Sequence, residues 1–220
     1  MIVVDPGHSV SISATDPRNH LDVSDYENEP EMRNVFQVAL IVQRRLRAAG
    51  YRVVLTKRRL YAPTSLLMRA QVANREHAAL ALSIHDQAGS NGGVGFDAGN
   101  NIVYYQRVGD YRVNERGRKV VFRNHRVARL SRRYGRIFGR ERAAVQHAHM
   151  TVQGSTGYNL GSRGLPAGNI WIVQLLSKVP WIYNEAGGNS AGRVGLSGRD
   201  RRRYAAGLVA SVERCVPIRH

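Results

Sequence analysis

The chain has 220 residues, 43% of them hydrophobic, and its 33 Lys and Arg against 16 Asp and Glu give a formal net charge of +17. This hydrophobic content is enough for a packed core, which excludes a disordered chain and fits one globular domain. The single cysteine, Cys215, excludes an intramolecular disulfide framework and a multi-cysteine metal cluster. A bound metal ion would therefore need histidine and carboxylate ligands.

The distribution of apolar and basic residues bears on membrane insertion, on export and on the kind of partner. No stretch has the roughly 20 apolar residues of a transmembrane helix, and the N-terminus lacks the basic and apolar regions of a signal peptide. We therefore expect no membrane span and no export by the usual secretory route. Residues 107–142 carry thirteen Lys and Arg against three acidic residues. Such charge predicts an anionic polymer or surface as partner.

The first third of the chain alternates predicted strands and helices. A buried strand at 2–4 ends in Asp5-Pro6-Gly7-His8, and a polar loop at 9–30 leads to a helix at 31–49. A strand at 51–56, a helix at 65–77 capped by Thr64 or Ser65, and a strand at 79–84 follow. This alternation predicts a parallel sheet with crossover helices. The strand at 79–84 ends at His85, so we expect His8 and His85 at one edge of the sheet.

The remaining elements are expected to complete the same domain. We predict a strand at 102–106, an amphipathic helix at 124–148 with its arginines outward, strands at 168–176 and 180–186, and a helix at 198–216 that buries Cys215. No linker divides the chain. The expected fold is a single α/β domain with a mostly parallel, twisted sheet of about six strands and helices on both faces.

Five ordered features together carry a family resemblance. They are IVVDPGH at 2–8, Glu31 at the start of a helix, VVLTKRR at 53–59, LMRAQVANREHAALALSIHD at 67–86 and VPWIYNEAG at 179–187. In this order they resemble the zinc-dependent N-acetylmuramoyl-L-alanine amidases, the family called amidase_3. The resemblance implies one amidase catalytic domain over residues 1–220, with the basic segment and helix at 107–148 inside it. It implies cleavage of the amide between N-acetylmuramic acid and L-alanine in peptidoglycan.

The resemblance also implies a metal site. The family's zinc ligands correspond to His8, a glutamate that opens the first helix, and His85. Glu27, Glu29 and Glu31 all lie there; we choose Glu31 because it stands nineteen positions before Gly50, the family's usual spacing, and the helical period starts with it. Two imidazoles and one carboxylate leave a fourth position for water, as in catalytic rather than structural zinc sites.

A second carboxylate is expected to move the proton. The family's late-strand glutamate corresponds to Glu185, which we expect to take a proton from water and deliver it to the leaving amine. Asp5 or Asp86 could accept a hydrogen bond from an imidazole. The sequence departs from the family's usual pattern at Asp86 and at Gly188. His147 and His149 are expected at the surface, and Arg163 is as compatible with substrate contact as with plain solvation.

Three other functions compete with this interpretation. A zinc peptidase or carboxypeptidase usually carries two ligands close together, as in HxxE or HExxH, whereas His8 and Glu31 are far apart. A non-catalytic module would use the same positive charge to bind the cell wall and would hydrolyse nothing. Nucleic-acid binding has the arginines but no recognised motif. We expect a monomer that acts at the bacterial cell wall, either as a bacteriophage endolysin or as the catalytic domain of a wall-remodelling enzyme.

Overall fold

A central sheet of six strands organises the computed structural model of the chain. The structure describes residues 1–86, 101–155, 164–165, 171–187 and 196–218. The strand order is β2-β1-β3-β8-β4-β7, with bounds β1 (Ile2–Pro6), β2 (Val53–Leu55), β3 (Leu80–Asp86), β4 (Ile102–Tyr105), β7 (Thr151–Gly154) and β8 (Trp181–Ala186). Strands β2, β1, β3 and β8 run parallel, β4 is antiparallel to β8, and β7 is parallel to β4. The predicted mostly parallel sheet is confirmed.

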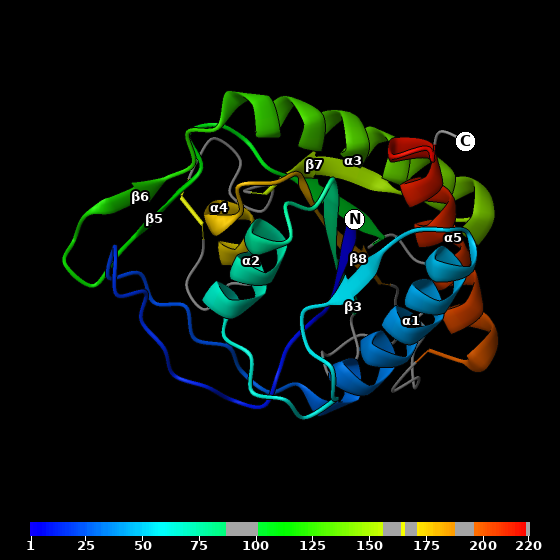
Figure 1. The fold of residues 1–220 in the computed structure, drawn as a ribbon, viewed down its shortest axis with the longest axis horizontal. Coiled ribbons are helices and arrows are strands. Elements are labelled where there is room, and N and C mark those ends of the chain that lie inside the picture. The colour runs from blue at the N-terminus through cyan, green and yellow to red at the C-terminus, as the bar shows by residue number, and fades with distance from the viewer. Residues whose placement is uncertain (87–100, 156–163, 166–170, 188–195, 219–220) are drawn as a thin grey trace.

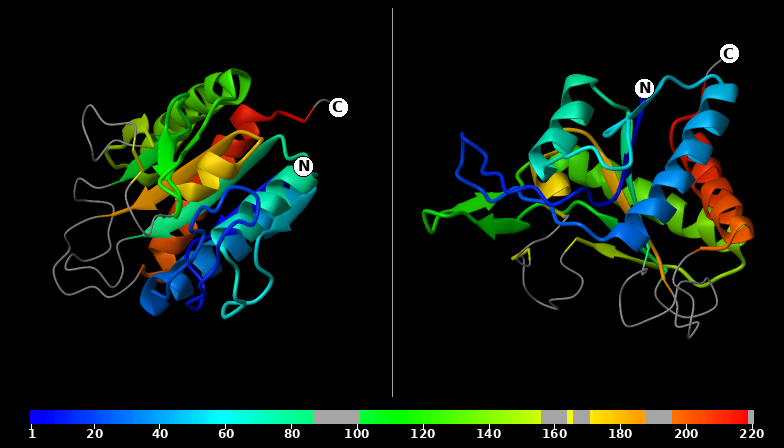
Figure 2. Two further views of the ribbon diagram at one scale, coloured as in Figure 1. Left: turned by 90° about the vertical axis from the view of Figure 1, so that its left-hand side faces the viewer. Right: turned by 90° about the horizontal axis from the view of Figure 1, so that it is seen from below.

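Helices cover both faces of this sheet. Figure 1 shows α1 (Glu29–Ala48) and α5 (Gly198–Cys215) on one side with α3 (His125–Gln146) across the top, and α2 (Leu66–Arg75) and α4 (Ile172–Leu176) on the other side. The view from below in Figure 2 separates the same two groups. Each face has its own buried apolar cluster, because strand side chains alternate between the faces. None of the helices in the described ranges is long and apolar enough to cross a membrane.

Most predicted elements are present with small shifts at their ends. The first helix begins at Glu29, with Pro30 in its first turn, and Ser65 rather than Thr64 caps α2 by accepting a hydrogen bond from the Met68 amide. Asn124 caps α3 in the same way. Cys215 is buried in α5, as expected.

The strand predicted at 168–176 is wrong. Residues 168–170 lie outside the described residues, and Ile172–Leu176 forms the short helix α4. A short apolar run does not distinguish a strand from a helix that is buried all round. Here the Gln174 side chain donates to the carbonyls of Tyr104 and Trp181, which holds the helix against β4 and β8.

Three short strands were not predicted. β5 (Tyr111–Val113) and β6 (Lys119–Val121) form a hairpin within the basic segment, and β7 pairs with β4 at the edge of the sheet. The hairpin turn uses Gly117 with φ +70°. Charged residues conceal the strand period here, so the composition indicated only a basic segment.

A buried ion network joins the first strand to the long loop. Arg69 is completely buried and donates to Asp5 Oδ1 at 3.0 Å, to the Pro6 carbonyl at 2.9 Å and to Asp25 Oδ2 at 2.5 Å. Asp5 also accepts from Thr56 at 2.5 Å and from Ser83 at 2.8 Å. The network therefore connects β1, α2, β3 and the loop at 9–28.

Replacing Arg69 by Met should strongly destabilise the fold. The variant leaves two buried carboxylates without their cation, and breaking such a pair costs about 3–5 kcal/mol. The matched control is Arg75→Met, because Arg75 is exposed on the same helix and should change stability by less than about 0.5 kcal/mol. Denaturant unfolding measures both. Equal stability of the two variants would contradict the role given to the network.

Candidate metal and hydrolytic site

The carboxyl ends of three adjacent parallel strands carry the predicted site residues. Pro6 of β1 pairs with Ile84 of β3, so His8 follows two residues beyond the strand and lies beside His85. His85 pairs in turn with Glu185 of β8. All three side chains are buried, with residue exposures of 3%, 1% and 8% respectively. The structure thus brings His8, His85 and Glu185 together at the carboxyl ends of the parallel strands.

The Glu31 carboxylate lies between the two imidazoles. Its Oε2 is 2.8 Å from His8 Nε2 and its Oε1 is 2.7 Å from His85 Nδ1. Asn28 donates to Oε2 at 2.9 Å, and the Asp86 amide donates to Oε1 at 3.2 Å. Both carboxylate oxygens are therefore fixed in place.

Neither competing glutamate reaches this position in the structure. Glu29 is half-exposed and pairs instead with Arg33 at 2.6 Å and with the Tyr61 hydroxyl at 2.8 Å. Glu27 is exposed. Of the three candidates that the sequence left open, the structure gathers Glu31 with the histidines.

The chain around His8 fixes the orientation of its ring. His8 Nδ1 is 3.2 Å from the Tyr26 carbonyl, and the Tyr26 ring meets the imidazole edge-on at 4.8 Å. A donor role for Nδ1 leaves Nε2 free to face Glu31. His8 has φ +52°, a conformation that costs a non-glycine residue about 1–3 kcal/mol. The buried Lys57 ammonium donates to the carbonyls of Gly7 and His8, and so holds this turn.

The His85 ring packs against Tyr183 and Gly7. The Tyr183 ring stacks on the imidazole at 4.4 Å with an interplanar angle of 8°. Gly7, directly after β1, lies against the ring, and a Cβ added there would lie 2.1 Å from His85 Cε1. Glycine is therefore required at this point of the DPGH turn. His85 Nε2 is buried and has no hydrogen-bond partner among the described residues.

Burial and neighbouring charges act in opposite directions on the pKa values of the site. Burial alone would raise the pKa of Glu31, but the adjacent imidazoles of His8 and His85 outweigh burial and lower this pKa to about 2. Burial would lower the pKa of His8, yet the Glu31 carboxylate raises it. Burial dominates at His85 and lowers its pKa. Glu31 thus remains an anion in a buried pocket, which favours a cation beside it.

Glu185 is a separate buried acid next to this cluster. Its Oε2 accepts a hydrogen bond from the Tyr183 hydroxyl at 2.9 Å. Burial and the negative charge of Glu31 raise the pKa of Glu185 well above its usual value. A carboxyl group of raised pKa beside a cluster of potential ligands is suited to take up and release a proton.

Arg142 supports the Glu185 segment from behind the sheet. Its guanidinium is completely buried and donates to the Glu185 carbonyl at 2.9 Å and the Ile102 carbonyl at 3.2 Å. The expectation that the arginines of this helix face outward is wrong for Arg142. It stands four residues after the buried Phe138 and so continues the inward stripe of α3, a signal that helical spacing could have revealed.

The side-chain cluster fits a divalent metal ion. One ligand atom from each of His8, Glu31 and His85 lies within 4.8 Å of the others. Tetrahedral zinc with bonds of about 2.0–2.2 Å needs its ligand atoms roughly 3.3–3.5 Å apart, which small side-chain shifts would provide. The donor set of two imidazoles and one carboxylate suits zinc, and the anionic Glu31 supplies complementary charge.

Other predicted positions have different outcomes. The Asp5 carboxylate is occupied by Arg69, Thr56 and Ser83 rather than by an imidazole. His147 and His149 are exposed, as expected. Arg163 and Gly188 lie outside the described residues. The roles of Tyr26, Lys57 and Tyr183 in holding the site were not predicted; of these, only Lys57 carried a signal, since it closely follows the end of a predicted strand.

Replacing Gly7 by Ala should weaken zinc binding at the candidate site. The new methyl group must displace the His85 ring, so we expect zinc affinity to fall roughly 10- to 100-fold. The control is Gly198→Ala, where an added Cβ meets only the flexible ends of Arg202 and Arg201 at 3.5 Å and beyond. Competition with a chromogenic chelator measures the affinity. Unchanged affinity in Gly7→Ala would show that the contact does not shape the site.

Solved structures of amidases share the fold of this chain. A sequence comparison with curated proteins finds no significant match. Among solved structures, the N-acetylmuramyl-L-alanine amidase of Mycobacterium smegmatis is 18% identical with a TM-score of 0.61, covering 97% of this chain and 95% of that one. The apo amidase of Mycobacterium abscessus is 19% identical with a TM-score of 0.62, covering 98% and 97%. An amidase of Clostridium difficile 630 is 18% identical with a TM-score of 0.61, covering 100% and 97%.

These likenesses establish a shared fold. The family model Amidase_3, described as N-acetylmuramoyl-L-alanine amidase, matches residues 2–187. This range spans β1 to the end of β8 and contains His8, Glu31, His85 and Glu185. The chain therefore belongs to the Amidase_3 family of N-acetylmuramoyl-L-alanine amidases.

Proposed function

We propose that the chain hydrolyses the amide between the lactyl group of N-acetylmuramic acid and the L-alanine of the stem peptide in peptidoglycan, with Zn²⁺ held by His8, Glu31 and His85. The observation that carries the proposal is the convergence of these three buried side chains beside Glu185. In this proposal residues 1–220 form one amidase catalytic domain with the basic segment and helix at 107–148 inside it, and the family match over residues 2–187 supports this.

The protein supplies the fixed surroundings of the reaction. When bound, zinc supplies Lewis-acid polarisation of the scissile carbonyl and makes water acidic enough to attack near neutral pH. The Tyr26 carbonyl and the Tyr183 ring set the orientations of the two imidazoles. The ligands are thus held in place before substrate arrives, which reduces the reorganisation needed during the reaction.

Glu185 is the proton carrier in this mechanism. Its carboxylate accepts a proton from the attacking water and delivers it to the nitrogen of L-alanine as the carbon–nitrogen bond breaks. The Tyr183 hydroxyl keeps the carboxylate in position through its hydrogen bond to Oε2. The products are the free lactyl carboxylate and an intact stem peptide.

Two rival functions make different products. A zinc peptidase or carboxypeptidase would shorten stem peptides instead of releasing them whole, and mass spectrometry of digested muropeptides distinguishes the two. A non-catalytic wall-binding module would sediment with walls but release nothing. We place the enzyme's action at the bacterial cell wall, and an endolysin is one context that fits a basic amidase domain.

Replacing Glu185 by Gln should separate catalysis from metal binding. The amide cannot accept the proton, so we expect release of stem peptides from purified walls to fall about 10²- to 10⁴-fold. Bound zinc, measured by atomic absorption after dialysis, should remain at the native level. The control is Glu213→Gln, since Glu213 is exposed on α5. Near-native activity of Glu185→Gln would remove this residue from the mechanism.

The choice of carboxylate ligand can be tested in the same way. Glu31→Gln should lose zinc and activity together, because the buried anion that balances the metal charge is removed. Glu29→Gln and Glu27→Gln should retain both, since their carboxylates lie outside the pocket. Chelation of the native enzyme followed by added zinc should abolish and then restore activity. Zinc retained by Glu31→Gln and lost by Glu29→Gln or Glu27→Gln would assign the ligand differently.

A further inference from the structure

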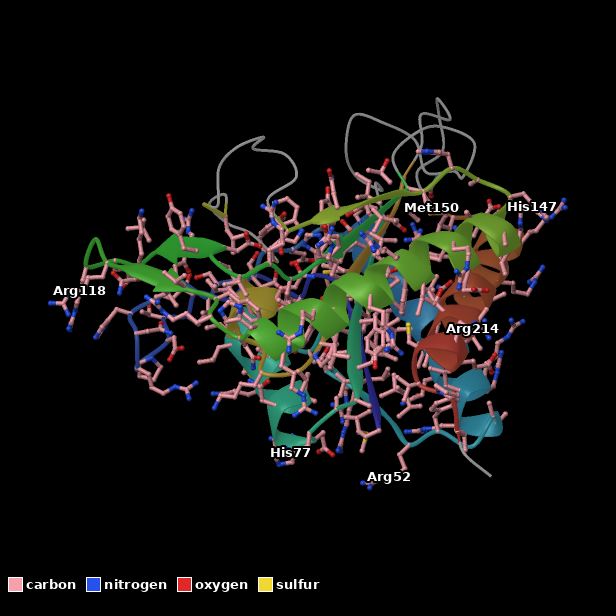
Figure 3. The ribbon with its side chains drawn as sticks, turned by 90° about the horizontal axis from the view of Figure 1, so that it is seen from above. Arg52, His77, Arg118, His147, Met150 and Arg214 are labelled. Carbon is pink, nitrogen blue, oxygen red and sulfur yellow. The ribbon has the colours of Figure 1, made fainter. Side chains whose placement is uncertain are left out.

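A row of exposed arginines runs along the outer side of α3. Arg129, Arg132, Arg133 and Arg136 form this α3 arginine face, and helical spacing of three and four residues puts them side by side. Figure 3 views the molecule from this side, with α3 crossing in front of the sheet. Within the described ranges, none of the four forms an ion pair, and Glu141, the only acidic residue of α3, pairs with Arg140.

The face is hollowed along its length. One hollow of about 290 Å³ is lined by Arg129 and Arg132 together with Arg107 and His125. A second hollow of about 390 Å³ shares Arg129 and Arg132 with the first and extends to Arg136. The two hollows therefore adjoin at Arg129 and Arg132, and cationic side chains line them at successive turns of the helix.

The arginines of this face repel one another, and a bound anion would relieve that repulsion. Like charges three or four residues apart destabilise a helix by about 0.2–0.5 kcal/mol per pair. The guanidinium groups have their donors available, and each fork matches a phosphate or carboxylate in bidentate geometry. A ligand with several anions in a row would contact successive arginines at once.

Two classes of anionic partner fit this face poorly. The large hydrophobic side chains that are exposed in the described residues all lie outside α3, and Ile137, which lines the second hollow, is partly buried, so this face has little apolar surface to insert into a membrane. Tyr134 and Phe138 are buried, so the imidazole of His125 in the first turn is the one exposed ring that α3 offers for stacking on bases.

We propose that the α3 arginine face is a second binding site, which holds a flexible phosphodiester polymer attached to the cell wall. Such a polymer carries a negative charge on each repeat and can place successive phosphates against successive arginines. The inference rests on the proposed function for the choice of a wall polymer. The catalytic edge would then be held near its substrate by a contact that takes no part in hydrolysis.

Cosedimentation with cell walls tests the proposal. Native protein should bind walls that carry the phosphodiester polymer at least about tenfold more tightly than walls stripped of it by hydrofluoric acid, with the difference shrinking as salt rises. The test variant changes Arg129, Arg132, Arg133 and Arg136 to Gln. It should lose this preference and bind both kinds of wall equally.

A matched variant controls for net charge. Changing Arg44, Arg45, Arg52 and Arg59 to Gln removes the same charge from exposed positions elsewhere, and should keep most of the preference. Equal losses in the two variants would overturn the proposal, because overall charge would then explain binding. Equal binding of native protein to both kinds of wall would also overturn it, and this comparison needs no variant.

Two further measurements keep the outcomes distinct. Tighter capture by anionic lipid vesicles or by double-stranded DNA than by polymer-bearing walls would overturn the choice of partner. Hydrolysis of a small soluble muropeptide, which lacks the polymer, should be the same in native protein and in both variants. Absence of this hydrolysis in the native protein would contradict the proposed function. The cosedimentation results would still decide the binding proposal.

Discussion

The buried guanidinium of Arg69 is the constraint on which the arrangement of the site depends. It joins the end of β1, through Asp5 and the Pro6 carbonyl, to Asp25 of the long loop. His8 follows Pro6 by two residues, and Tyr26, whose carbonyl orients His8, follows Asp25 directly. One buried cation therefore sets both the position of an imidazole and the group that fixes its tautomer. A network of this kind contributes specificity of geometry more than stability, because desolvation offsets much of its attraction.

The second constraint is the register of three parallel strands. His85 and Glu185 are direct neighbours across β3 and β8, and the same register puts Gly7 against the His85 ring. The side chains at this edge come from segments far apart in the sequence, so their approach depends on the sheet rather than on local structure. The cost of burying Glu31 as an anion is offset by two imidazoles, and a metal ion at the same place would replace weak charge pairing by direct ligation.

The sequence was sufficient to predict which residues lie at the carboxyl ends of the parallel strands. It was insufficient to predict most of the side chains that hold those residues in place. Strands ending in histidine indicated His8 and His85 because strand direction and chain order determine where parallel strands end. Which of the three glutamates joins the histidines depends on which side chain points inward at the start of α1. Only the fold shows that Asn28 and the Asp86 amide hold Glu31 there. The strand predicted at 168–176 failed because a buried short helix and a buried strand are equally apolar. Arg142 was misassigned because arginine was treated as a surface residue regardless of its place in the helical period.

The contrast between buried and exposed arginines explains how so basic a chain can hold a cation. Asp5, Asp25, Glu31 and Glu185 are buried together around the sheet edge, where Arg69 balances two of them and the imidazoles balance a third. Helix α3 packs on the same face of the sheet as α1, and its exposed arginines lie on the solvent side of the helix. Solvent and salt screen their repulsion on a metal ion at the edge, whereas the buried carboxylates act on it through protein of low polarity. The proposed cation site and the proposed site for an anionic polymer are therefore compatible within one chain.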